Sequence, residues 1–165
     1  MQCGDMVVYG IHGVCRIVDT ESRTVDKRQV EYFVLQPCDQ LDARFYIPTQ
    51  NPAALAKLRR ILSREEVEAL LDSKEVKDGL WIADETARKD KYRKILANAD
   101  CAELIGMIRV LYFHKQQQLA AGRKFHQCDE SFMKDAERLI RSELSCVLGI
   151  PQAEVGQYIY NKLET

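Results

Sequence analysis

The pattern of hydrophobic positions changes period near residue 48. From about residue 5 to residue 48, β-branched and aromatic residues alternate with their neighbours, as in Val30–Leu35. A period of two is typical of half-buried β-strands. It predicts four or five short antiparallel strands, with polar turns at residues 22–28 and 37–42. A small, strongly curved barrel of the Tudor or SH3 type would accommodate so many short strands.

After Pro48 the period becomes helical. Asn51 followed by Pro52 predicts a helix start, because an N-cap residue precedes a proline at the first helical position. The sequence Ser-Arg-Glu-Glu at 63–66 fits a capping box. A polar loop is expected at 73–79. Further helices are expected over about 85–98, from Asp100 to Gly122, from about 129 to 149, and after Pro151. The chain is thus predicted to be α+β, with domains at 1–50 and 51–165.

The composition supports a folded protein outside the membrane. Hydrophobic residues make up 46% of the chain, enough for a real core. No apolar run approaches the roughly 20 residues of a membrane span, and no signal sequence precedes the first strand. The six cysteines are scattered without a C-x-x-C pair. We therefore expect a soluble cytoplasmic protein without disulfides and without a membrane partner.

Positive charge is concentrated in one window of a nearly neutral chain. The formal net charge is −1, yet residues 86–126 carry nine basic and three acidic residues. Such a window is a candidate contact for nucleic-acid phosphates, and the alternative is an ordinary solvated helix face. The candidate DNA-binding residues within it are Arg88, Lys89, Lys91, Arg93 and Lys94.

Trp81 is the only tryptophan and precedes this basic helix. It stands between a polar loop and the helix, outside any apolar run. Two interpretations are open. The ring can plug the helical core from its rim, or it can present itself to a base step while basic neighbours hold the phosphates.

Catalytic and metal sites find little support. The nearest metal-like grouping is His12-x-x-Cys15 with Cys3, and it lacks a fourth ligand at suitable spacing. No nucleophile elbow or phosphate-binding glycine loop is present. We expect no catalytic residue, no metal, no cofactor and no small-molecule substrate.

The stretch Gly4–Ile17 carries a resemblance to a known family. It reads GDMVVYGIHGVCRI, a strand, a turn with two glycines, and a second strand. This resembles the opening of the RNA-polymerase-interacting domain shared by CarD/CdnL-like bacterial transcription regulators and transcription-repair coupling factors, with Gly10 where the family usually has proline. Residues 100–111 and 129–148 also resemble the family's helical patterns, so the resemblance covers most of the chain.

The resemblance implies a Tudor-like domain that docks on the polymerase β subunit. Arg23 matches a family position that contacts this subunit. Tyr46 stands where the family often places a basic residue, with Arg44 two positions earlier on the same strand face. These three residues are the candidate polymerase-binding residues.

For the helical part, the resemblance implies an exposed tryptophan at the upstream edge of the melted promoter bubble. Trp81 and the basic helix would then contact promoter DNA without sequence specificity and stabilise the open complex. In one branch of the family, basic residues follow the tryptophan almost at once, whereas the stretch Ile82-Ala83-Asp84-Glu85, with two acidic residues, intervenes here.

Two other classes of function compete with this hypothesis. The small barrel could belong to a Tudor/KOW-like module that binds RNA or ribosomes. An enzyme that uses Cys15 or Cys128 is the third possibility. Co-purification with polymerase or ribosomes, and sensitivity to thiol alkylation, would separate the three.

Overall fold

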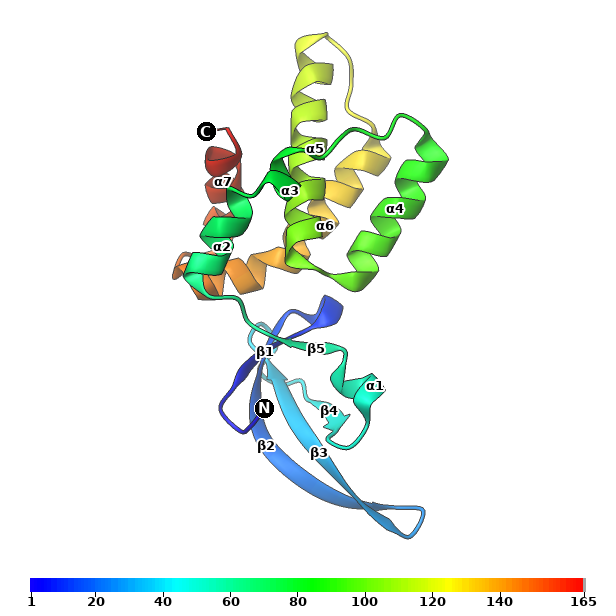
Figure 1. Cartoon of the computed structure of the whole chain (residues 1–165), viewed down its shortest axis with the longest axis vertical. Coiled ribbons are helices and arrows are strands. Elements are labelled where there is room, and N and C mark those ends of the chain that lie inside the picture. Colours follow the sequence, from blue (N-terminus) through cyan, green and yellow to red (C-terminus); the bar gives the residue numbers. More distant parts are fainter. Residues whose placement is uncertain (165) are drawn as a thin grey trace. The chain divides into compact units, whose positions relative to one another are not determined.

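The computed structural model describes residues 1–164, which divide into two compact units, Met1–Ile61 and a second unit that begins at Leu62 (Figure 1). The first unit is built on a sheet and the second is helical, which confirms the predicted α+β class. Within the described part of the chain, no helix is both long enough and apolar enough to cross a membrane.

Five antiparallel strands form the sheet of the first unit. They are β1 (Met6–Tyr9), β2 (Val14–Val25), β3 (Arg28–Pro37), β4 (Phe45–Pro48) and β5 (Leu58–Arg60), arranged in the order β4-β3-β2-β1-β5. A 3-10 turn, η1 (Gly10–His12), joins β1 to β2, and the short helix α1 (Pro52–Leu55) precedes β5. Over residues 1–164, β4 and β5 remain the two edges of an open sheet. The expected closed Tudor or SH3 barrel is therefore not confirmed.

One face of this sheet carries the core of the first unit. Ile17 pairs with Leu35, and a bulge between Ile17 and Asp19 shifts the register by one residue. Bulges increase the local twist and bend the strand. The buried core side chains are Val7, Cys15, Ile17, Leu35, Ile47 and Leu58. Each fully buried aliphatic side chain contributes about 1.5–3 kcal/mol, so this small core depends on every strand, β5 included.

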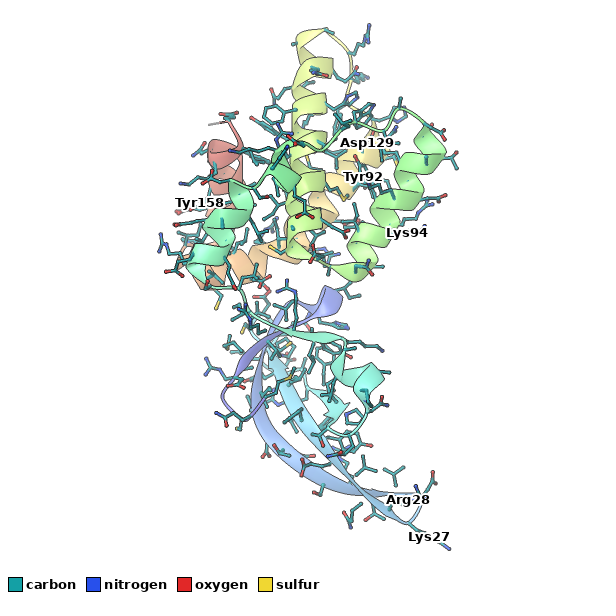
Figure 2. All side chains as sticks on the ribbon, in the orientation of Figure 1. Lys27, Arg28, Tyr92, Lys94, Asp129 and Tyr158 are labelled. Carbon is teal, nitrogen blue, oxygen red and sulfur yellow. The ribbon has the colours of Figure 1, made fainter. Side chains whose placement is uncertain are left out.

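The predicted turn at residues 22–28 is wrong in extent. β2 continues to Val25, and the turn consists of Asp26 and Lys27 at the end of the hairpin (Figure 2). Both have positive φ, 49° and 64°, as a two-residue type I′ turn requires. The end of the hairpin is exposed on both faces, so the hydrophobic alternation that marks a strand is missing there.

The first unit also extends further than the predicted boundary at residue 50. Asn51 caps α1 as expected, accepting a hydrogen bond from the Ala54 N–H. The chain then returns to the sheet, where Leu58 pairs with Tyr9 and Arg60 with Val7. A strand of three residues is too short to show a period of two, so the sequence predicts a helical region here.

The second unit contains six helices within residues 62–164. They are α2 (Arg64–Leu71), α3 (Lys74–Lys77), α4 (Glu85–Asn98), α5 (Cys101–Ala120), α6 (Gln127–Leu148) and α7 (Gln152–Leu163). The predicted bounds of α4 are confirmed, and so is the capping box of Ser63 and Glu66. The predicted loop at 73–79 is wrong, because Ser73 caps α3 and Val76 is fully buried.

Helices α5 and α6 form the centre of the helical core. Leu104, Ile105, Ile108 and Leu111 of α5 are almost completely buried, and they pack with Ile140 and Leu144 of α6. A buried carboxylate fastens the start of the unit to this core, since Glu143 accepts a hydrogen bond from the Leu62 N–H at 3.1 Å. Gly149, at a φ of 68°, ends α6 as a left-handed C-cap.

Candidate functional site

The structure brings together two of the three residues proposed for polymerase binding. The Arg23 guanidinium carbon lies 4.2 Å from the centre of the Tyr46 ring. Both residues are exposed, and Glu21 forms an ion pair with Arg23 at 3.0 Å. The pairing of Glu21 with Tyr32, and of Tyr46 with Val34, places this group on the sheet face opposite the core.

Arg44, the third of these residues, lies just before β4 and is held by the preceding turn. Its Nη1 donates hydrogen bonds to the carbonyl oxygens of Leu41 and Ala43, at 2.8 and 2.7 Å. The residue is exposed, so its remaining donors can still meet a partner. Arg23 and Tyr46 are in contact, and Arg44 precedes Tyr46 by two residues. We call these three exposed residues the β2–β4 rim.

An aromatic group at the first turn was missed by the sequence analysis. The rings of Tyr9, His12 and Phe45 lie 4.5–5.3 Å apart, centre to centre. They close over the end of the core, and the neighbouring Ile11 is 56% exposed. Phe45 is more than thirty residues away from the turn, so only the pairing of the strands could reveal this contact.

Most of the basic residues of α4 lie on the surface as predicted. Lys91 and Lys94 are exposed, and no ion pair holds either of them within residues 1–164 (Lys94 is labelled in Figure 2). Lys89 pairs with Glu85 at 2.8 Å, and Arg93 approaches Asp90 at 3.7 Å. Both are local pairs on one helix, which contribute little to stability and leave the cations accessible.

Arg88 does not lie on this surface, which corrects its assignment as a DNA-binding residue. It is only 6% exposed, and its Nε and Nη2 donate to the two carboxylate oxygens of Asp129 at 2.9 and 3.3 Å. Its Nη1 donates to the carbonyl oxygen of Ile82 at 3.0 Å. A guanidinium with these partners in the interior is not free to bind a phosphate.

Trp81 is half-buried at the edge of the helical core. Its ring stacks on His114 with a centre-to-centre distance of 3.5 Å and an angle of 6° between the planes. The Arg88 guanidinium carbon lies 4.4 Å from the same ring. The ring therefore packs against the core and remains partly accessible, which combines the two interpretations that the sequence left open.

His114 is the residue beneath Trp81 that the sequence analysis did not identify. Burial lowers its pKa below the ordinary value of 6.5, the positive Arg88 lowers it further, and Asp129 acts in the opposite direction. The imidazole is therefore neutral at pH 7. Gln118 lies within hydrogen-bonding distance of its Nε2, at 3.2 Å, and Phe125 packs nearby with ring centres 6.3 Å apart.

Leu80, beside Trp81, is 84% exposed, although it is a large apolar residue. Leu80 and Ile82, on either side of Trp81, line one pocket together with Lys91 of α4, so an exposed apolar side chain and a cation lie close together beside the tryptophan.

Cys15, one of the two thiols considered for catalysis, is buried. Burial raises the pKa of Cys15 to about 11, with smaller contributions from Cys38 and Asp39. Its thiol is thus protonated near neutral pH, and the thiolate is the nucleophile in cysteine chemistry. Among residues 1–164, no group of three or more histidine, cysteine, aspartate or glutamate side chains is arranged to hold a metal ion.

Comparison with known protein families identifies the first unit. The family described as the CarD-like/TRCF RID domain matches residues 1–62, which corresponds to the sheet unit with one further residue. No curated protein matches the chain. The N-terminal unit of this protein is therefore a CarD-like RNA-polymerase-interacting domain.

Proposed function

We propose that the protein is a non-catalytic bacterial transcription regulator of the cytoplasm, which binds the polymerase β subunit and stabilises the promoter open complex. The observation that carries the proposal is the match of residues 1–62 to an RNA-polymerase-interacting domain. The N-terminal domain binds the polymerase, and the helical unit contacts the promoter DNA.

The β2–β4 rim supplies the polymerase contact. The Arg23 guanidinium and the Tyr46 ring are exposed and in contact with each other, so the arginine is held in place by the ring and by Glu21. An ordered cation loses less side-chain entropy on binding than a free one. Such a rim suits an acidic surface on the β subunit, where charged contacts accelerate association and select the partner.

The second unit supplies the DNA contact through Trp81, Lys89, Lys91, Arg93 and Lys94. Arg88 is excluded because it is buried. Non-specific DNA binding by a few cations is weak and depends on salt. Docking of the N-terminal domain on the polymerase would raise the local concentration of the helical unit at the promoter. This explains how a protein with a net charge of −1 acts on DNA.

Charge reversal tests the polymerase contact. Arg23→Glu combined with Tyr46→Ala should abolish capture of the β subunit by the full chain, with the circular-dichroism spectrum unchanged. Lys57→Glu is the matched control, because Lys57 is exposed in the same unit and outside the rim. Undiminished capture by the double variant would refute the rim. Co-sedimentation with ribosomes instead of polymerase would favour the RNA-binding alternative.

The DNA contact is tested by Trp81→Ala. Stacking of an aromatic ring on a base contributes about 1–3 kcal/mol, so the lifetime of the promoter complex should fall by roughly 5- to 150-fold. Binding to the polymerase should persist. Lys91→Ala and Lys94→Ala should each lower the slope of log affinity against log salt concentration by about one unit, as expected for the loss of one phosphate contact. Lys134→Ala on the exposed side of α6 is the control. An unchanged lifetime for Trp81→Ala would remove the tryptophan from the mechanism.

A further inference from the structure

Three residues from three helices converge on the irregular segment that carries Trp81. Arg88 comes from α4, His114 from α5 and Asp129 from the first turn of α6, where Asp129 is labelled in Figure 2. Arg88 and Asp129 lie 41 residues apart in the sequence and are 6% and 2% exposed. Residues 81–83 belong to no helix or strand, and Asp84 is only the N-cap of α4. Their conformation therefore depends on contacts with the helices.

A buried ion pair such as Arg88–Asp129 is weak evidence for a role in stability. The cost of removing both charges from water can exceed their mutual attraction, and apolar replacements are often as stable. The geometry of Arg88 suggests another role, because one of its donors, Nη1, takes no part in the ion pair. This donor binds the carbonyl of Ile82, the residue next to Trp81, while the guanidinium contacts the indole ring.

Only arginine can make all of these contacts at once. Its planar guanidinium binds a carboxylate with two donors, keeps a third for the Ile82 carbonyl, and stacks on an aromatic ring. Lysine has a single charged nitrogen and no planar group. The Trp81 ring has a second contact, because it stacks parallel to the ring of the neutral His114. The backbone and the side chain of the Trp81 segment are thereby both held.

We propose that the Arg88–Asp129 pair is a positioning device, which holds Trp81 in the orientation needed to meet the promoter DNA. Arg88 and Asp129 do not touch the DNA themselves; they act through Trp81. This inference rests on the proposed function, because it concerns how the same DNA contact is organised. The position of Trp81 can nevertheless be measured without any DNA.

The test replaces the ion pair with apolar residues of similar size, in the double variant R88M/D129L of the full chain. No charge is then left unpaired in the core, so the thermal midpoint should be retained. Trp81 is the only tryptophan, and its fluorescence therefore reports on this segment alone. We expect its emission to shift to longer wavelength and its quenching by acrylamide to increase, since the ring is no longer held.

The matched control is the double variant R138M/D135L. Arg138 and Asp135 form an exposed pair of the same residue types on α6, 4.0 Å apart. Its removal should change neither the emission nor the quenching of Trp81. Unchanged fluorescence in folded R88M/D129L would overturn the proposal.

A second variant decides the question if R88M/D129L does not fold. Arg88→Lys keeps the charge pair with Asp129 but loses the bond to Ile82 and the stacking on the ring. Altered Trp81 fluorescence with a folded core supports positioning. Unchanged fluorescence, or failure of this conservative variant to fold, assigns the pair a purely structural role and overturns the proposal.

The promoter measurement separates this inference from the proposed function. If both hold, R88M/D129L loses as much promoter-complex lifetime as Trp81→Ala and still binds the polymerase. If Trp81→Ala itself has no effect, the DNA role of Trp81 fails, and with it the functional part of this inference. If Trp81→Ala shortens the lifetime and a folded R88M/D129L does not, the positioning role alone is refuted.

Discussion

Tyr92 places its hydroxyl group in the helical core without a hydrogen-bond partner among residues 1–164. The residue is 3% exposed, and its ring packs edge-on against Phe132. Burial and the nearby Asp129 raise its pKa to about 12, so the group remains protonated. Unpaired buried polar groups of this kind lower stability by about 1–3 kcal/mol.

We therefore expect Tyr92→Phe to raise the free energy of unfolding by about 1 kcal/mol, because it removes the unpaired hydroxyl and keeps the ring. Denaturant unfolding of the full chain measures the change. The matched control is Tyr112→Phe, which loses a hydrogen bond to Glu164 and should bring no gain. A less stable Tyr92→Phe variant would mean that the hydroxyl is paired in solution.

His114 predicts a pH dependence of stability. Its folded-state pKa lies below the ordinary 6.5, chiefly because of burial. Between these two values the unfolded chain binds more protons than the folded one. This contribution to stability is therefore complete above pH 6.5 and is lost as the pH falls through the folded-state value. In His114→Gln the decline of the thermal midpoint below pH 6.5 should be shallower than in the wild type. Equal slopes in the two proteins would show that His114 does not cause the decline.

At the scale of the element, α4 shows why one basic residue differs from its neighbours. Tyr92 and Ile95 form its buried stripe, and Arg88 lies four residues before Tyr92 on the same side. The helical period thus contained a signal for the burial of Arg88. Its partner Asp129 lies on another helix, so the ion pair itself could not be seen in the sequence.

The turn of the β2–β3 hairpin offers a second test at this scale. Lys27 is exposed and has a φ of 64°, a conformation that costs a side chain about 1–2 kcal/mol and costs glycine little. After allowing for the greater freedom of glycine in the unfolded chain, Lys27→Gly should stabilise the hairpin by about 0.5–1 kcal/mol.

Amide hydrogen exchange at residues 22–31 measures this effect. The control is Arg28→Gly, one position later, where the backbone is an ordinary strand and glycine should destabilise the hairpin. Faster exchange in Lys27→Gly than in the wild type would show that the positive φ is not strained.

At the scale of the whole molecule, the structure fixes which fragment should fold as the polymerase-binding domain. Residues 1–50 lack β5 and Leu58, a core side chain that contributes about 1.5–3 kcal/mol. They also leave β1 as an unpaired edge. A fragment of residues 1–61 should melt cooperatively and capture the β subunit, whereas residues 1–50 should be markedly less stable. Equal melting of the two fragments would show that β5 adds nothing to the domain.

Local patterns in the sequence determined the class of the fold and most helix ends. Caps and periods act over a few residues, so Ser63, Asp100 and Gly149 mark the starts or ends of helices without knowledge of their neighbours. The motif of residues 4–17 was sufficient to predict an RNA-polymerase-interacting domain, which the family match over residues 1–62 confirms.

The tertiary structure decided which side chains meet. β5 forms by pairing with the edge of β1. The β2–β3 hairpin extends through polar residues because its two strands pair with each other. The contacts of Trp81 with His114 and Arg88 join positions separated by 33 and 7 residues in different elements. Burial and pairing over such distances depend on how the helices pack, and no local pattern of residues encodes that packing.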